Sequence, residues 1–277
     1  MNTLLADPKP ATRPAGVWDY ISPSRLNLWL KCPLAFKLRY IDGIRSPTTP
    51  ALFLGKRVHQ GLEIFYHHRQ LGIQLEPGDV VRRMNDSWDA AVADEEMTIK
   101  STADAEALQG REGDLVRAYL HYVPDDEPLP TIVETPLEAP LVDPINGEHL
   151  GIPLLGIVDL VLDRHDGALL CDFKTAARST PPSEISHEIQ LTAYAYLLRQ
   201  MTGCQESGLE IRSLVKTKTP QIVFHPFGAR TDAHFRRLFA VIRGYLDDLD
   251  AGRFVFRPGF SCSMCDFRDS HCGTWRG

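Results

Sequence analysis

The run Gly156-Ile-Val-Asp-Leu-Val-Leu162, followed after a polar turn by Ala168-Leu-Leu-Cys-Asp-Phe-Lys174, decides the fold of this chain. Both runs are rich in aliphatic residues, which predicts two strands buried in a sheet. The Asp-Gly pair between them is a signal for a hairpin turn. If a four-residue loop at 164–167 closes the hairpin, Asp159 lies directly opposite Asp172. The chain then places two carboxylates face to face in an apolar sheet, where a free charge is unfavourable.

The second strand adds a cation to this pair. Asp172 and Lys174 are two residues apart and share one face, while Cys171 and Phe173 point to the other face. Facing carboxylates repel each other unless a cation lies between them, and their hard oxygen atoms suit Mg²⁺ or Mn²⁺. Lys174 could orient or deprotonate a water and stabilise charge on a phosphate. An Asp-x-Lys pair alone is usually a solvated surface pair; Asp159 within an apolar strand favours phosphodiester hydrolysis instead.

Two predicted helices carry further candidates. The helix at 53–70 has His59 and Glu63 four residues apart on one face, and the helix at 184–201 has Gln190 and Tyr194 at the same spacing. A single helical histidine is more often structural than a metal ligand, and core packing would explain Tyr194. A glutamine beside a tyrosine can also hydrogen-bond a phosphate or a metal-bound water.

The distribution of charge leaves room for a nucleic-acid surface although the net charge is −6. Residues 76–148 hold 18 acidic and 5 basic residues, so the rest of the chain is net positive. Phosphate contacts need local cations rather than a basic whole. A solvated helical surface is the alternative explanation. The segment 21–60 supplies the candidate DNA-binding residues, which are Arg25, Lys31, Lys37, Arg39, Lys56 and Arg57.

The six cysteines are distributed unevenly. Cys262, Cys265 and Cys272 cluster near the end, and Cys32, in a helix-breaking Lys-Cys-Pro, is the candidate for a fourth ligand. No secretion signal precedes them, so we expect a cytoplasmic protein in which clustered thiols bind metal. Thiolates favour a [4Fe–4S] cluster or Zn²⁺ over Mg²⁺.

The order of the predicted elements indicates an α/β chain with four parts. Two short helices are expected across 23–41, two or more within 79–122, and single helices at 53–70, 184–201 and 232–250. Strands are expected at 132–142, 150–162, 168–174, 208–216 and 220–227. We expect a disordered lead at 1–19, a helical region carrying Cys32 and His59 at 20–130, a catalytic core at 131–252 and a Cys-rich tail at 253–277. No apolar run is long enough to span a membrane.

Six motifs occur in order: SPSRLNLWLKCPLAFKLRYIDG, GKRVHQGLE, GIVDLVL, CDFKT, QLTAY and C-x2-C-x6-C. Over about residues 20–275 this set resembles the RecB-type branch of the PD-(D/E)XK nucleases, and most of all the CRISPR-associated and phage-encoded iron–sulfur exonucleases. The resemblance implies a restriction-endonuclease-like core, with a central mixed β-sheet flanked by helices, an N-terminal helical cap and a C-terminal iron–sulfur clasp. It favours the cluster over zinc.

The same resemblance assigns roles to single residues. It makes His59, Asp159, Asp172 and the backbone carbonyl of Phe173 metal ligands, and Lys174 the catalytic lysine. Gln190 and Tyr194 become the accessory motif, and Cys32, Cys262, Cys265 and Cys272 hold the cluster. Asp172 stands where the family often has Glu, which the motif permits. The helical stretch 72–122 matches no motif.

The implied activity is Mg²⁺- or Mn²⁺-dependent exonucleolytic hydrolysis of DNA, single-stranded or with free ends, in repair, recombination or CRISPR adaptation. The alternative is a DNA-binding adaptor subunit whose cutting is gated by a partner, although an adaptor need not keep Asp159, Asp172 and Lys174. The chain has no G-x-x-x-x-G-K-[ST] loop. Any ATP-driven motor activity would therefore come from a helicase, recombination or CRISPR-adaptation partner. An oxidoreductase is disfavoured because no dinucleotide fingerprint is present.

Overall fold

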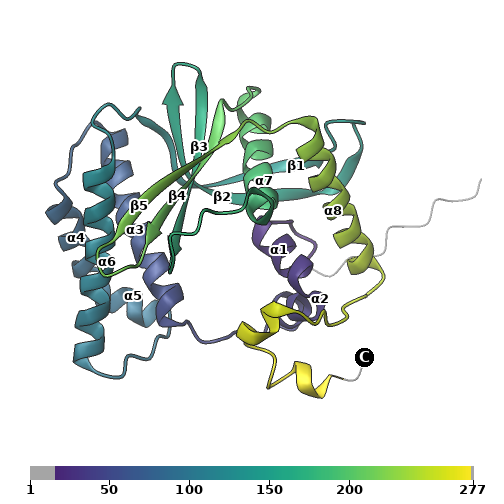
Figure 1. Ribbon diagram of the computed structural model, residues 1–277. Coiled ribbons are helices and arrows are strands. Elements are labelled where there is room, and N and C mark those ends of the chain that lie inside the picture. Colours follow the sequence, from purple (N-terminus) through teal and green to yellow (C-terminus); the bar gives the residue numbers. More distant parts are fainter. Residues whose placement is uncertain (1–15, 276–277) are drawn as a thin grey trace, which may run out of the picture.

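The computed structural model describes residues 16–275 and is built around one mixed β-sheet (Figure 1). The five strands lie side by side in chain order: β1 (Pro130–Val142), β2 (His149–Arg164), β3 (Gly167–Ala176), β4 (Gly208–Val215) and β5 (Gln221–Gly228). Only β3 and β4 pair in parallel, and the chain between them forms helix α7 (Glu184–Thr202). The α/β class and the mixed sheet flanked by helices are confirmed.

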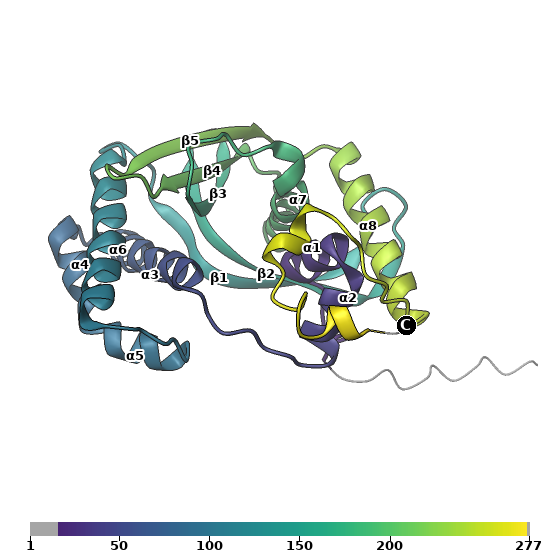
Figure 2. The same ribbon diagram turned by 60° about the horizontal axis from the view of Figure 1, so that its bottom comes forward.

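Two helical layers cover the sheet. One core cluster joins α7, α1 (Pro23–Lys31) and α8 (Asp232–Asp250) to one face. A second cluster joins α3 (Pro50–Gln70), α4 (Pro77–Asp86) and α6 (Thr102–Tyr122) to the other face. Figure 2 shows α3–α6 gathered at one end of the molecule and α1, α8 and the yellow tail at the other end. The sheet between these ends is where the two layers meet.

The helices begin where local chemistry favours it. Ser22, Thr49 and Ser101 accept hydrogen bonds from the backbone of the first turn of α1, α3 and α6, and α1 and α3 start with proline. After α1, Pro33 starts the short helix α2 (Pro33–Phe36), which continues as a π-helical turn at Lys37–Ile41. The helix α5 (Trp88–Asp94) and two 3₁₀ turns, Phe260–Met264 and Cys272–Thr274, complete the elements.

The N-terminal lead differs from the expectation where the structure describes it. Residues 1–15 lie outside the described part of the chain. Residues 16–19 form a turn in which the Asp19 amide donates to the Gly16 carbonyl, and Val17 is buried in the core. The expected disorder therefore does not extend to these four residues, because Val17 gains apolar contacts there. Within residues 16–275, none of the helices has the length and apolar character to cross a membrane.

Candidate active site

The β2–β3 hairpin has the register that the turn signal predicts. Leu160 pairs with Cys171 and Arg164 pairs with Gly167, so the next pair outward is Asp159 with Asp172. Asp159 is 7% exposed and Asp172 is 1% exposed. The amide of Phe173 donates a 2.8 Å hydrogen bond to Oδ2 of Asp159. The two carboxylates thus meet in the interior, and a backbone donor from β3 fixes one of them.

Asp172 is surrounded by the other predicted residues. The Lys174 ammonium lies 2.9 Å from Oδ1 and 2.7 Å from Oδ2 of Asp172. Gln190 on α7 donates to the same Oδ1 at 2.8 Å and also to the Tyr194 hydroxyl at 2.9 Å. The structure therefore brings Lys174, Gln190 and Tyr194 together around one buried carboxylate.

Helix α7 can pack close to β2 because the strand residue opposite it is Gly156. A Cβ atom on Gly156 would lie 2.8 Å from Leu197 and 3.1 Å from the Tyr194 ring. Those distances are shorter than van der Waals contact, so any side chain at 156 would displace the α7 residues. Gly156 therefore helps to set the height of Tyr194 above the sheet.

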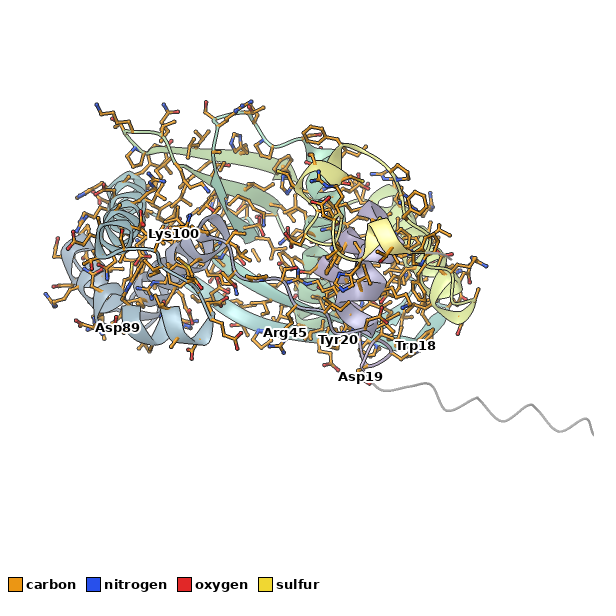
Figure 3. All side chains as sticks on the ribbon, turned by 90° about the horizontal axis from the view of Figure 1, so that it is seen from below. Trp18, Asp19, Tyr20, Arg45, Asp89 and Lys100 are labelled. Carbon is orange, nitrogen blue, oxygen red and sulfur yellow. The ribbon has the colours of Figure 1, made fainter. Side chains whose placement is uncertain are left out.

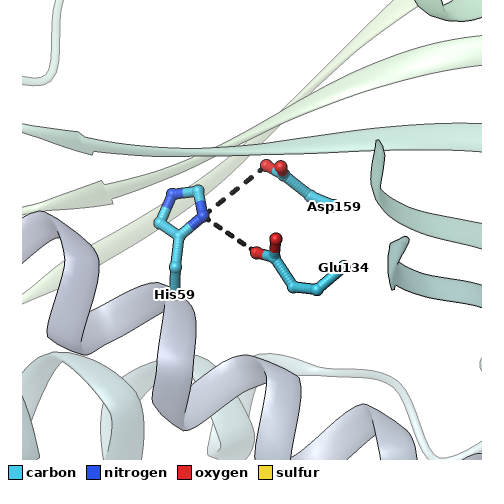
Figure 4. Close-up of side chains that lie close together, drawn as sticks. All are labelled: His59, Glu134 and Asp159. Atoms are coloured by element: carbon cyan, nitrogen blue, oxygen red, sulfur yellow. Dashed lines mark hydrogen bonds and ion pairs between the residues drawn. The ribbon is translucent and has the colours of Figure 1, made fainter. Parts of the chain in front are cut away.

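Helix α3 delivers His59 to the edge of the same site (Figure 4). Its Nδ1 lies 3.2 Å from Oε1 of Glu134 and 3.8 Å from Oδ2 of Asp159, and its Nε2 lies 3.1 Å from the Phe173 carbonyl oxygen. Gly55 permits this approach, because a Cβ there would lie 3.2 Å from Oγ1 of Thr175 on β3. Two carboxylates and one carbonyl therefore converge on the imidazole.

Glu134 is a site residue that the sequence did not reveal. It lies on β1 between the paired residues Val133 and Thr135, whose partners are Leu160 and Val158, and so it faces Asp159. Its φ of 38° is unusual for a residue other than glycine. Backbone strain of this kind often accompanies functional sites. Glu134, Asp159 and Asp172 thus form one row across three neighbouring strands.

The electrostatics of the row favour binding of a cation. Burial, followed by the charge of Asp172, raises the pKa of Asp159 to about 7. Burial lowers the pKa of His59, but the Glu134 hydrogen bond and the charges of Asp159 and Glu134 outweigh it and raise that pKa overall. The charges of Asp172 and Glu134 both make Asp159 harder to ionise. A divalent cation would relieve this repulsion.

The donor set fits a hard divalent ion. Among the described residues, the only three ligand-type side-chain atoms that all lie within 4.8 Å of one another belong to His59, Glu134 and Asp159. Adjacent ligands in an octahedral site are about 3 Å apart, close to the 3.2 Å between Nδ1 of His59 and Oε1 of Glu134. Buried Oδ2 of Asp172 has an ammonium nearby but accepts no well-directed hydrogen bond, so it keeps a lone pair for a ligand.

Comparison with known proteins identifies the family of this chain. The model of the PD-(D/E)XK nuclease superfamily matches residues 20–272, which is most of the chain. The chain belongs to the PD-(D/E)XK nuclease superfamily. Nucleases of this superfamily use divalent metals, and the group formed by His59, Glu134 and Asp159 could hold one.

Solved structures support the fold. A protein from Eubacterium rectale described as "Putative exonuclease" shares 14% identity, with 89% of this chain and 87% of that chain covered at a TM-score of 0.56. A structure described as SSO0001 shares 13% identity over 93% of this chain and 88% of that chain, with a TM-score of 0.44. A comparison with curated proteins finds no match. Of these two structures, the first has a TM-score high enough to support the fold.

The candidate DNA-binding cations of this PD-(D/E)XK chain fall into three groups. Lys31 and Arg39 are exposed and form no ion pair with the described residues. Lys37 pairs with Asp42, and Lys56 pairs with Glu95.

The third group is buried. The guanidinium of Arg25 donates to the carbonyls of Gly16, Val17 and Tyr20. Arg57 pairs with Glu112 inside the helical insertion, the name used here for helices α3–α6 at residues 50–122. These two arginines are 7% and 2% exposed. Both guanidinium groups are buried and bind protein oxygens, so we do not propose that Arg25 and Arg57 contact DNA.

The structure brings the four predicted cluster cysteines to one place. All four line a single pocket beside α1 and α2, and three of them pack against the apolar group Leu34, Ala35, Leu38 and Phe267. Burial, followed by the charges of Cys32, Cys265 and Cys262, raises the pKa of the Cys272 thiol. Cys171 is buried in the sheet and Cys204 is exposed elsewhere, so neither belongs to this group.

Proposed function

We propose that this chain is a Mg²⁺- or Mn²⁺-dependent DNA exonuclease that acts on single strands or on DNA ends. One observation carries the proposal: His59, Glu134, Asp159 and Asp172 converge from α3, β1, β2 and β3, with the Lys174 ammonium 2.7 Å from Asp172. A row of acids beside an amine is the donor set that phosphodiester hydrolysis requires. The superfamily match supports a nuclease, while cleavage from an end rests on the motif resemblance.

In the proposed mechanism each side chain has a distinct task. His59, Glu134, Asp159, Asp172 and the Phe173 carbonyl would hold the ion. When bound, the ion supplies Lewis acidity toward a water and a phosphate oxygen.

The remaining tasks fall to three residues around Asp172. Lys174 would donate to the attacking water and stabilise charge that develops on the phosphate. Gln190 orients Asp172 through their hydrogen bond, and Tyr194 supports Gln190 in turn. Residue placement of this kind contributes to rate by fixing the reacting geometry.

We further propose that Cys32, Cys262, Cys265 and Cys272 hold a [4Fe–4S] cluster. The four cysteines line one pocket, and soft thiolates suit an iron–sulfur cluster or Zn²⁺. The motif resemblance favours the cluster over zinc. Such a clasp ties α1 and α2 to the tail and restricts the unfolded chain.

The proposed path for DNA runs along exposed cations between the two ends of the molecule. Lys31 and Arg39 line the cysteine pocket, and Arg45 lies on the exposed linker between the π-helical turn and α3. Figure 3 shows Arg45 between the insertion, marked by Asp89 and Lys100, and the N-terminal segment, marked by Tyr20. Cations that carry no acidic partner are suited to phosphate contacts.

We place the activity in DNA repair, recombination or CRISPR adaptation, in the cytoplasm, with a helicase or other partner supplying any strand separation. The sequence has no nucleotide-binding loop of its own. The alternative function is a DNA-binding adaptor with partner-gated cleavage. Exposed Lys31 and Arg39 would serve either function, whereas the complete row of acids favours the enzyme.

The test is a cleavage assay on 5′-labelled and 3′-labelled DNA, single-stranded and duplex, with Mg²⁺, Mn²⁺ or EDTA. We expect metal-dependent shortening from an end, and a loss of about a hundredfold or more in Asp159→Ala. Asp163→Ala, at an exposed position on the same strand, is the matched control and should cleave normally. Tight DNA binding by a wild-type protein that never cleaves would favour the adaptor. Equal cleavage by Asp159→Ala would refute the assigned site.

A further inference from the structure

Phe173 lies between Asp172 and Lys174 on β3 and links the candidate site to the opposite face of the sheet. The Phe173 amide holds Asp159, and the Phe173 carbonyl lies 3.1 Å from His59. The ring points away from the site into the helical insertion. It stacks on Tyr66 of α3 at a centroid distance of 6.0 Å, and it meets Tyr119 of α6 edge-on at 5.5 Å. One peptide of the site therefore depends on how the insertion packs.

A buried arginine organises the two tyrosines. Arg212 on β4 is the strand neighbour of Phe173 and is 3% exposed. Its Nη1 lies 2.6 Å from the Tyr119 hydroxyl, 2.9 Å from the Tyr66 hydroxyl and 2.6 Å from Oε1 of Glu127. The Tyr66 hydroxyl donates to Oε2 of Glu127 at 3.0 Å. Side chains from α3, from β4 and from the stretch 119–127 thus meet at one guanidinium.

The network is closed on its remaining sides. The Nε of Arg212 donates to Glu210 at 2.7 Å, and the guanidinium lies over the Phe224 ring at 4.3 Å. Burial raises the pKa of the Tyr66 and Tyr119 hydroxyls, so both remain neutral hydrogen-bonding groups. In the described chain, none of the buried side-chain atoms of Arg212, Glu127, Tyr66 or Tyr119 lacks a hydrogen-bond partner.

Such a network contributes more to geometry than to stability. A buried ion pair is often no more stabilising than apolar residues of similar volume. Apolar packing tolerates small shifts, whereas a guanidinium held by several directed hydrogen bonds has few arrangements that keep them. Arg212 and its partners therefore define the position of Tyr66 and Tyr119, and these define the height of the Phe173 ring.

We propose that Arg212, Glu127, Tyr119 and Tyr66 are positioning residues for the Phe173 peptide, and that through them the helical insertion sets the affinity of the site for its divalent ion. This assigns a task to part of the stretch 72–122, for which the motifs give none. It rests on the proposed function, because the peptide matters only if the row of acids binds metal. Groups that orient metal ligands commonly change metal affinity by about 10- to 100-fold.

The test compares two buried glutamates that each bind an arginine. Glu127→Gln removes the negative charge that pairs with Arg212. The control, Glu206→Gln, removes the negative charge that pairs with Arg199, near α7 and α8 and away from Phe173. Tyr119→Phe is a milder second variant that keeps the ring. For each folded protein we would measure Mn²⁺ binding without DNA, by electron paramagnetic resonance, together with the Tm and the nuclease rate at increasing Mn²⁺.

We expect the Kd for Mn²⁺ to rise about tenfold in Glu127→Gln and by a smaller factor in Tyr119→Phe, with the nuclease rate recovering at saturating Mn²⁺. Glu206→Gln should keep the wild-type Kd even where its Tm falls as far. An unchanged Kd in both network variants, or an equal rise in Glu206→Gln, would overturn the positioning role. A wild-type protein that binds no Mn²⁺ would instead overturn the proposed function itself.

Discussion

Replacing Asp159 by asparagine should stabilise the metal-depleted protein and remove its affinity for Mn²⁺. Asp159 lies in the interior opposite Asp172 and near Glu134, and these surroundings raise its pKa from the ordinary 3.8 to about 7. Ionising it therefore opposes folding. Asparagine keeps an oxygen that can accept from the Phe173 amide but carries no charge, so the repulsion disappears together with a proposed ligand.

The magnitude follows from the difference between the two pKa values. The folded protein holds an extra proton between pH 3.8 and about 7. The protonated Asp159 carboxyl therefore stabilises the folded state at low pH. This contribution falls as the pH rises from 3.8 to about 7 and is lost above that range. At ~1.4 kcal/mol for each tenfold change in proton affinity, the penalty at pH 8 is about 4 kcal/mol. At pH 5 it is roughly a third of that.

The assay is thermal unfolding of EDTA-dialysed wild type, Asp159→Asn and the exposed control Asp163→Asn at pH 5 and pH 8. We expect the Asp159→Asn Tm to exceed the wild-type Tm at pH 8 by at least about 4 °C, with a smaller gain at pH 5. Excess Mn²⁺ should raise the Tm of wild type and of the control but not that of Asp159→Asn. An Asp159→Asn variant that is less stable than wild type at pH 8, or that still gains stability from Mn²⁺, would refute this electrostatic account.

Three further outcomes are expected. Lys174→Ala should bind single-stranded DNA with nearly unchanged affinity in a filter-binding assay but cleave it at least about a hundredfold more slowly; normal cleavage would remove Lys174 from the mechanism. Gly156→Ala should lower the stability by ~1–3 kcal/mol and slow cleavage, because the new methyl group meets Leu197 and Tyr194, whereas Gly110→Ala, with open space around it in α6, should be neutral or stabilising in denaturant titrations. Anaerobically purified protein should be brown with visible thiolate-to-iron absorption, and Cys32→Ala should lose both the colour and several degrees of Tm; a colourless protein with stoichiometric zinc would contradict the cluster.

The β2–β3 half of the site was predictable from sequence because its register depends on local signals. A short Asp-Gly loop leaves few ways to close a hairpin, and alternation along β3 then orders Asp172, Phe173 and Lys174. Periodicity likewise located the long helices, with the expected 53–70 observed as Pro50–Gln70. These features depend on neighbours within about twenty residues.

Glu134 could not be found in the same way. Its strand belongs to the longer β1–β2 hairpin, where Val142 pairs with His149 but Pro140 pairs with Pro153. This register shift moves the pairs from Pro140 back to Ile132 by two residues. Extending the pairing from the Asn146-Gly147 turn without the shift would put Glu134 opposite Ile157 rather than Asp159. An irregularity of this kind has no reliable signature in a single sequence.

The buried arginines show a different limit. Arg57 lies three residues after Leu54 and four before Gly61, both on the buried stripe of α3, so helical spacing alone would have placed it inward. A count of the basic residues in the segment 21–60 does not take into account that Arg57 points inward. The partner that makes burial tolerable, Glu112, is 55 residues away, and no local pattern announces it.

Strand alternation also explains why the insertion and the site cannot be independent. If the carboxylate and the amine of Asp-x-Lys face α7, the residue between them must face the opposite layer. In this chain that residue is Phe173, whose amide and carbonyl face Asp159 and His59. Tyr66 and Tyr119, which pack on the Phe173 ring, therefore affect the position of the backbone between the proposed ligands. The aromatic and arginine network under β3 is a means of holding that backbone still while acidic groups above it repel one another.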